Sequence, residues 1–257
     1  MPTDDPRATV QIPAPPWRSA RDARRPVEPR PPLSREAIVD AGIAVLLRDG
    51  IDALSMRQVA GELGTGPASL YAHVANKDDL LDLIYDRAFD GVQVPEPDPE
   101  RWREQVRALA LTMVERLVAY NGIAIVGLAN VPSGANSLRI AEGLLRILLA
   151  GGVPPADAGI FLDRVSMMAV CDAYEASIYQ ARQRASGKDP GTFLADYFGQ
   201  IRQFIGALPA EHFPTLRGMV SEVVDPDGDQ RYEFGIDLMI EGLAARAARA
   251  AAPSEPS

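Results

Sequence analysis

The sequence predicts an all-α fold in which an N-terminal three-helix helix-turn-helix domain is followed by a larger helical domain. One observation is that apolar residues recur every three or four positions, as at Val106, Leu109, Met113 and Leu117. This is the period of an amphipathic helix. A second is that residues 54–81 carry capping residues, glycines and a proline at the spacing of short consecutive helices. A chain of 257 residues is long enough for two such domains.

The first predicted helix begins after Ser34, whose hydroxyl group can cap it. Ile38 and Val45 lie on one face of this helix, and Asp49-Gly50 ends it. We expect it to brace the two helices that follow.

A capping box predicts that the second helix begins at Met56. Ser55 and Gln58 have the S-x-x-Q spacing, in which the serine and the glutamine satisfy free N–H groups at a helix start. Gly64 can take the left-handed conformation that closes a helix, and residues 65–66 complete a short turn. A turn of this length between two helices is typical of a DNA-binding helix-turn-helix.

The third predicted helix covers residues 67–74 and starts with a proline, which suits the first helical position. At helical spacing, Leu70 and Val74 share the inner face, and Ala68 and Ala72 lie opposite. This small outer face would allow close approach to a DNA groove, where alanine methyl groups can meet thymine methyl groups.

Asn76 can cap the next helix, predicted at residues 77–92, and Asp78 and Asp79 complement its dipole. Residues 95–99, with three prolines, then mark a domain boundary. The expected parts are a disordered Arg/Pro-rich arm at residues 1–32, a helix-turn-helix domain with its connecting helix at 33–94, a helical ligand-binding and dimerisation domain at 95–251, and a disordered tail at 252–257. Helices of the larger domain are expected at residues 101–120, 122–129, 137–150, 154–184, 191–208, 213–224 and 229–250.

One stretch resembles the DNA-binding domain of tetracycline-repressor (TetR) family regulators, over about residues 34–89. The residues that carry the likeness are LSMRQVA at 54–60, Gly64, LYAHVANK at 70–77 and Leu80-Leu81. The resemblance implies a homodimer that places its recognition helix in the major groove of operator DNA and loses DNA affinity when a small molecule binds. The family's closest pattern often has a bulky aromatic residue where this chain has Ala72, so base preference is not carried over.

By that likeness, the DNA would be faced by Ser55, Met56, Arg57, Thr65, Pro67, Ala68, Ser69, Tyr71, His73 and Lys77. For Tyr71 or His73 taken singly, packing against neighbouring helices is the alternative.

The formal net charge of −9 at first argues against a nucleic-acid partner. Residues 31–94 carry five basic and ten acidic side chains, but many of the acids follow the recognition helix and need not face phosphate. Residues 1–30 carry six arginines against four acids. We expect this arm to lie along phosphates or to enter a minor groove. A solvated tail without function is the alternative.

The resemblance also implies a dimer contact through the last long helices, within residues 156–183 and 232–246. Apolar stripes on these helices predict the contact residues: Phe161, Val165, Met168, Asp172, Ile236, Met239, Ile240 and Leu243. The alternative is that the stripes serve only the core of one chain.

A ligand pocket should be concave and mostly apolar, with a few polar groups. The candidates are Met113, Leu117, Asn121, Asn130, Met167, Tyr174 and Tyr179. Their character suggests a largely hydrophobic small-molecule effector. Ordinary core packing is the alternative for each of them.

Residues that could support catalysis or bind a metal are scarce. The chain has two histidines, His73 and His212, and one cysteine; a catalytic or metal site needs more converging groups. No phosphate-binding loop, G-x-S-x-G or H-E-x-x-H motif occurs. We therefore predict no enzyme activity, no cofactor and no metal. Cys171 lies in an apolar run and is expected to be buried and inert.

No apolar run approaches the roughly 20 residues of a spanning helix, and the N-terminus lacks the apolar core of a signal peptide. We expect a cytoplasmic protein with no membrane partner. The predicted function is a ligand-responsive transcriptional regulator, a repressor that binds a palindromic operator as a homodimer and is released by a small molecule. The alternative is an all-helical small-molecule binding or scaffold protein that no longer binds DNA.

Overall fold

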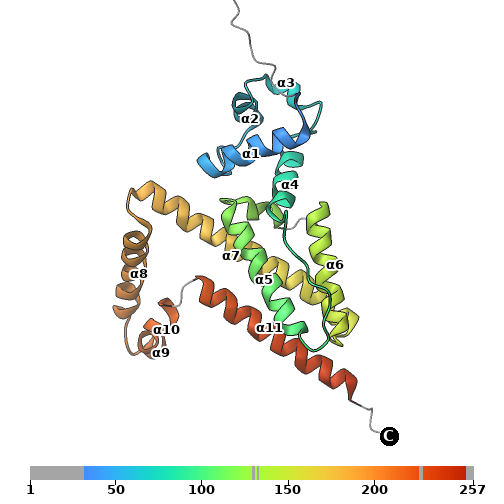
Figure 1. The fold of residues 1–257 in the computed structure, drawn as a ribbon. Helices are drawn as coiled ribbons and strands as arrows, with labels where there is room; N and C mark the ends of the chain where they lie inside the picture. The colour runs from blue at the N-terminus through green and yellow to red at the C-terminus, as the bar shows by residue number, and fades with distance from the viewer. Residues whose placement is uncertain (1–31, 129–130, 132, 226–227, 253–257) are drawn as a thin grey trace, which may run out of the picture. The chain divides into compact units, whose positions relative to one another are not determined.

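The computed structural model describes residues 32–128, 131, 133–225 and 228–252, and its regular structure there is helical throughout. The first helices are α1 (Arg35–Asp49), α2 (Met56–Glu62), α3 (Pro67–Leu70) and α4 (Lys77–Ala88). They are followed by α5 (Trp102–Ala119), the 3₁₀ helix η1 (Ile123–Gly127), α6 (Ala135–Ala150), α7 (Pro155–Ser186), α8 (Pro190–Gly206), α9 (Pro214–Gly218), α10 (Val220–Val224) and α11 (Gly228–Ala251). Figure 1 shows their arrangement.

Helices α1 to α3 and the start of α4 share one small core, which we call the head. Val45, Val59 and Leu70 are fully buried in it. Helix α1 approaches α4 closely at Gly42, where a Cβ atom would lie 2.8 Å from Cδ1 of Ile84. Helix α4 is therefore the fourth helix that encloses the core of the head.

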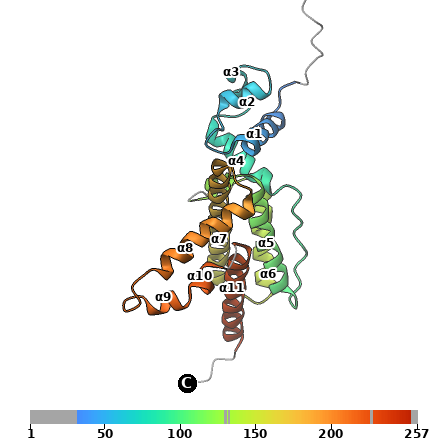
Figure 2. The same ribbon diagram turned by 90° about the vertical axis from the view of Figure 1, so that its left-hand side faces the viewer.

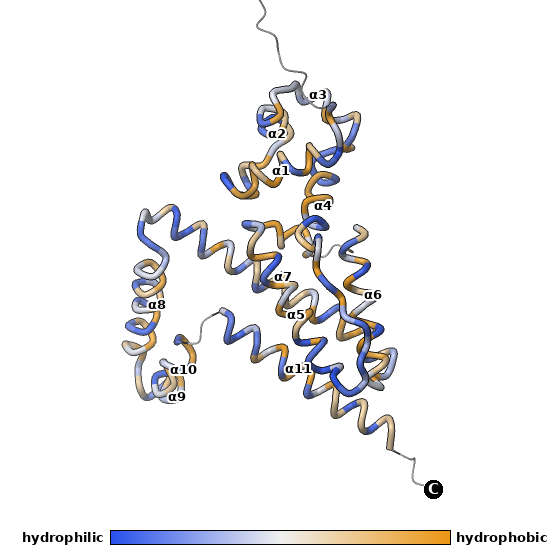
Figure 3. The backbone as a smooth tube through the Cα atoms, viewed as in Figure 1, coloured by the Kyte–Doolittle hydropathy of each residue, from blue (hydrophilic) through white to orange (hydrophobic). Residues whose placement is uncertain are grey.

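Helix α4 continues from the head into the larger domain, where it contacts α5, α6 and η1 (Figures 1 and 2). The stripe predicted on α5, from Val106 to Leu117, is buried as expected, mainly against α7. Helix α11 covers α5 and α7, and the hydroxyl of Tyr232 donates to the carbonyl of Ala110 at 2.8 Å. Figure 3 shows hydrophobic and hydrophilic residues alternating along these helices, as amphipathic packing requires.

Helices α8, α9 and α10 form a separate hairpin between α7 and α11 (Figure 1). Within it, only Ile205 and Val224 are buried. The hairpin meets α7 through an aromatic cluster, in which the ring centroids of Tyr179 and Tyr197 lie 5.6 Å apart. None of the helices in the described residues is long and apolar enough to cross a membrane.

Several predicted boundaries are wrong. The helix predicted at residues 77–92 ends at Ala88, because Gly91 turns the chain with a φ of +71°. The stretch predicted at 122–129 is a 3₁₀ helix, and the one at 213–224 is divided at Met219. The remaining helices of the larger domain lie within about two residues of their predicted ends. The predicted arm and tail lie outside the described residues, except for their innermost positions.

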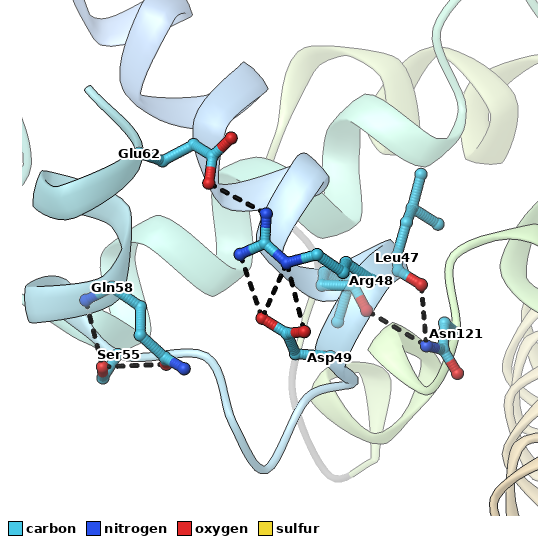
Figure 4. A network of polar contacts seen from close by, with 8 residues as sticks. Leu47, Arg48, Asp49, Ser55, Gln58, Glu62 and Asn121 are labelled. Atoms are coloured by element: carbon cyan, nitrogen blue, oxygen red, sulfur yellow. Dashed lines mark hydrogen bonds and ion pairs between the residues drawn. The ribbon is translucent and has the colours of Figure 1, made fainter. Parts of the chain in front are cut away.

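Asn121 joins the head to the larger domain (Figure 4). Its side-chain amide donates to the carbonyl groups of Leu46 at 3.0 Å and Leu47 at 3.4 Å, near the end of α1. Its side-chain oxygen accepts from Arg184 of α7 at 3.1 Å. Asn121 is buried and has a φ of +40°, a left-handed conformation that asparagine tolerates better than most residues.

We predict that Asn121→Ala lowers the thermal unfolding midpoint more than Asn121→Gly does. Both variants lose the hydrogen bonds of the Asn121 side chain, each of which contributes about 0.5–1.5 kcal/mol, but only alanine also meets a left-handed penalty of about 1–2 kcal/mol. Calorimetry at fixed protein concentration measures the order. Gln203→Ala, at an exposed position, is the control. Equal midpoints for the alanine and glycine variants would contradict the strain argument.

Candidate nucleic-acid interface and ligand pocket

The start of α2 is capped as predicted. The hydroxyl oxygen of Ser55 accepts from the backbone N–H of Gln58 at 3.3 Å and donates to the side-chain oxygen of Gln58 at 3.0 Å (Figure 4). The side-chain oxygen of Gln58 thus accepts from the serine hydroxyl, whereas in a complete capping box it accepts from the backbone N–H of the N-cap residue. Arg57, between them, is exposed.

The end of α2 is also as predicted, with Gly64 in the left-handed conformation at a φ of +63°. The N–H of Gly64 donates to Gly61 at 3.0 Å, and the N–H of Thr65 donates to Ala60 at 2.9 Å. This pair of bonds is a Schellman motif, which satisfies carbonyl groups at the end of a helix. It sets the direction in which the chain enters α3.

Helix α3 is shorter than the predicted recognition helix and ends at Leu70 rather than at residue 74. The chain then turns, with the N–H of Val74 donating to Leu70 at 3.0 Å. The helix does not continue because Asn76 is extended, with a φ of −163°, so that its side chain can cap α4 through Asp79 at 2.8 Å. The carboxylate of Asp79 in turn accepts from the N–H of Ala75 at 2.7 Å.

The inner and outer faces of this segment are assigned correctly. Leu70 and Val74 are buried, and the side chain of Tyr71 is 53% exposed. We call the exposed residues Pro67, Ala68, Ser69, Tyr71 and Ala72 the reading surface. Partly exposed candidates beside it are Ser55, Thr65, His73 and Lys77.

Met56 is buried, contrary to the prediction from the sequence. Its side chain is 8% exposed and belongs to the core of the head, so the prediction that it faces DNA is wrong. The first residue of α2 must turn inward, because Val59, three positions later on the same face, fills that core.

Ion pairs explain part of the unfavourable charge of the head. Arg48 binds Asp49 and Glu62 (Figure 4), and Arg87 binds Asp40 at 2.6 Å. Arg87 also lies 3.8 Å from Asp90, so these two arginines together engage four acids within the described residues. Arg57 and Lys77 are in no ion pair within the described residues and flank the reading surface.

Arg35 is a residue that the sequence did not single out for a contact with the reading surface. Its Nε donates to the carbonyl of His73 at 3.2 Å, where the turn after α3 ends. The two residues are 38 positions apart, and no local pattern connects them.

A cavity of about 380 Å³ lies in the larger domain, within the size range of small-molecule sites. Its wall is formed by Tyr85, Phe89, Met113, Gly127, Val131, Ser137, Leu138, Ile140, Ala141, Gly159, Leu162, Asp163, Ser166, Met167 and Val170. Most of these side chains are apolar. Burial raises the pKa of Tyr85 to about 12, so its phenol stays neutral near pH 7.

Two of the predicted ligand residues, Met113 and Met167, lie in this wall. Leu117 is buried elsewhere in the core, and Asn121 holds the end of α1. Tyr174 is outside the wall, and Tyr179 packs on the aromatic residues of α8. These four residues lie outside this cavity wall, which includes residues of α7 only between 159 and 170, so a role for them in ligand binding stays a prediction. Asn130 lies outside the described residues.

Residues of α4 were missed as part of the cavity. Tyr85 and Phe89 pack edge to face, with ring centroids 5.5 Å apart, and both line the wall. Sequence reasoning treated α4 only as a connector. The one available signal was a pair of aromatic side chains on a helix leaving the head.

The predicted dimer stripes are mostly internal. Phe161 and Val165 of α7 are buried, as are Ile236, Ile240 and Leu243 of α11, so within one chain they serve its own core. Met168, Asp172 and Met239 are half-buried. Burial raises the pKa of Asp172, with a smaller effect from Glu175.

Other apolar residues of the same two helices point outward: Ile160 of α7 and Phe234 and Leu238 of α11 are each more than half exposed. Cys171, expected to be buried, is exposed as well. The most exposed large apolar residues of these two helices are therefore not those of the predicted stripes. Within the described residues, no group of three or more His, Cys, Asp or Glu side chains is arranged to hold a metal ion.

Two family models match the chain. One, described as bacterial regulatory proteins of the tetR family, matches residues 38–84. The other, described as a tetracyclin repressor-like C-terminal domain, matches residues 94–247. The first covers much of the head and the second nearly all of the larger domain.

Individual proteins are similar over most of the chain. The HTH-type transcriptional repressor DrrR1 of Streptomyces coeruleorubidus is 27% identical over 91% of this chain and 86% of its own length. The class C tetracycline repressor of Escherichia coli is 26% identical over 82% of this chain and 90% of its own length. The structure of Streptomyces coelicolor ActR in complex with actinorhodin superposes with a TM-score of 0.76, at 36% identity, over 86% of this chain and all of that one. The chain therefore belongs to the tetR family of bacterial regulatory proteins.

Proposed function

We propose that this protein is a repressor that binds a palindromic operator as a homodimer and leaves it when a small molecule fills the cavity. The observation that carries the proposal is the position of α4. Its first turn is capped directly after the reading surface, and Tyr85 and Phe89 near its other end line the cavity. One helix thus contacts both the DNA-facing and the ligand-facing parts of the chain. Because a repressor acts on DNA, we also infer a cytoplasmic location.

The relatives support both halves of this proposal. DrrR1 and the tetracycline repressors are named as repressors, and ActR has been crystallised with actinorhodin. For this chain we infer an effector with a largely apolar body. Tyr85, Ser137 and Ser166 are available in the wall for a few hydrogen bonds.

We infer a homodimer formed by the outward faces of α7 and α11. Ile160, Phe234 and Leu238 expose apolar area there, and a twofold axis would bury each residue against the same surface of a second chain. Such a dimer would present two reading surfaces to half-sites about one helical turn of DNA apart.

A second candidate is a small-molecule binding protein that no longer binds DNA. The excess of acidic residues in the head favours it. Selection of bound duplexes from a random DNA pool separates the two functions. A repressor enriches one palindrome, whereas a folded protein that enriches nothing is the binding protein.

We predict that Tyr71→Ala weakens binding to the selected palindrome at least tenfold, about 1.4 kcal/mol, without lowering the thermal unfolding midpoint. The side chain is more than half exposed, so its removal affects DNA binding and little of the packing. Fluorescence anisotropy with a labelled duplex measures the affinity. The control is Leu194→Ala, an exposed apolar residue on α8. An unaltered affinity for Tyr71→Ala would place the reading surface elsewhere.

We predict that deleting residues 1–30 makes operator binding less dependent on salt. The segment carries six arginines, and the slope of log K against log salt should fall by about 0.9 for every phosphate that the arm no longer neutralises. Titrations at several salt concentrations give the slope for both proteins. The same slope in both would mean that the arm does not touch the DNA.

We predict that Ala141→Phe makes the repressor insensitive to its effector while operator affinity stays within about twofold. The added ring fills part of the cavity, since Ala141 lies in its wall. Release of the labelled duplex by a panel of aromatic apolar compounds measures the response. Ala150→Phe, an exposed position on the same helix, is the matched control. Full release from the Ala141→Phe protein would exclude this cavity as the effector site.

A further inference from the structure

We propose that Asp86 is a positioning residue that fixes α4 to α6 and thereby holds the head in the orientation that binds DNA. This inference rests on the proposed function, and it assigns to one carboxylate the link between the cavity and the reading surface.

Helix α6 has no capping side chain of its own, because its N-cap residue is Gly134. Asp86 supplies the cap from α4, about 50 residues earlier. One carboxylate oxygen accepts from the N–H of Ser137 at 2.8 Å and from its hydroxyl at 2.9 Å. The other accepts from the N–H of Asn136 at 3.2 Å and from its side-chain amide at 3.3 Å. These donors belong to the first turn of α6, where helix N–H groups are otherwise unpaired and favour a negative charge.

We call this contact between Asp86 and the first turn of α6 the joint, and its two sides approach each other closely. A Cβ atom built on Gly134 would overlap the carboxyl group of Asp86, so the joint requires glycine at this position. The side-chain amide of Asn136 also donates to the backbone carbonyl of Asp86 at 3.3 Å. The first turn of α6 is therefore tied to both the side chain and the backbone of α4.

The joint lies at the edge of the cavity. Tyr85 precedes Asp86 in α4, Ser137 is one of its donors, and both line the cavity wall together with Leu138. An effector that separates Tyr85 from Leu138 must displace the first turn of α6 relative to α4. Because Asp86 binds that turn, the displacement is passed to α4.

Movement of α4 reaches the reading surface through its other end. Asn76 and Asp79 cap that end and hold Ala75, which follows the turn after α3. The helix between this cap and the joint at Asp86 is continuous over Lys77–Ala88. A short uninterrupted helix transmits a shift at one end to the other.

The test uses the full-length protein and two independent ways of breaking the joint. Asp86→Ala removes the acceptor, and Gly134→Ala inserts a methyl group into it without changing the charge. Asp90→Ala is the charge-matched control, since the side chain of Asp90 is exposed and its carboxylate lies 3.8 Å from Arg87, while the contact with Arg116 involves only the backbone carbonyl. Gly199→Ala, where a Cβ atom meets nothing within 4 Å, is the control for the glycine.

Affinity is measured for the selected operator and for a random duplex. We expect both joint variants to lose at least tenfold in operator affinity with unchanged random-duplex affinity, and both controls to stay within twofold. Asp86→Asn, which keeps an acceptor oxygen, should recover part of the loss. Operator affinity equal to wild type overturns the proposal. A parallel loss for both duplexes also overturns it, because simple destabilisation has that effect.

A readout without DNA separates this proposal from the proposed function. Amide hydrogen exchange is measured at Ala75 and Asp79, whose N–H groups are held in the cap at the far end of α4. We expect faster exchange there in Asp86→Ala than in Asp90→Ala. Unchanged exchange overturns the proposal even if the protein is a repressor. Faster exchange in a protein that selects no operator would support the role of Asp86 in holding α4 but reject the repressor function.

Discussion

Helix α4 has to satisfy two packing environments at once, and the arrangement of the described residues depends on this constraint. Leu80 and Ile84 close the core of the head against α1, where Gly42 allows the approach. Tyr85, the residue after Ile84, and Phe89, about one turn further on, enter the core of the larger domain. The helix has 12 residues and so spans about 18 Å. A helix this short has no room to bend between the two environments, so each limits where the other can sit.

Three helix ends or turns in this chain are held by residues distant in the sequence. Asp86 caps α6, Asn121 binds carbonyl groups near the end of α1, and Arg35 binds the carbonyl of His73. Each of these bonds joins residues at least 38 positions apart. Buried or crowded helix ends need such partners, because unpaired backbone groups are costly away from water. The same bonds that complete the helices therefore also fix the helices to one another.

The features that were predicted correctly from the sequence are those that depend on interactions between residues close together in the chain. Ser55, Gly64 and Asn76 act within a few residues of themselves, and their roles in the head are confirmed. The family and its helical fold were also recognised. Most of the cavity wall was not, because a helical period predicts a buried face but does not identify the neighbour that buries it. From the sequence, Val165 and Ile236 could lie either in the core of one chain or in a dimer interface. The packing of α7 on α11 places both in the core.

The acidic character of the head is best understood from the same bonds. Asp79 and Asp86 hold the two ends of α4, while Asp40 pairs with Arg87 of α4 and Glu62 pairs with Arg48 of α1. These carboxylates contribute to structure as acceptors of hydrogen bonds and partners of arginines, and a lysine at the same positions would lose these contacts. Neutralising them to raise DNA affinity would therefore loosen the parts that orient the reading surface. Net charge measures attraction to phosphate, but here the placement of the acids also determines whether the reading surface is held in position.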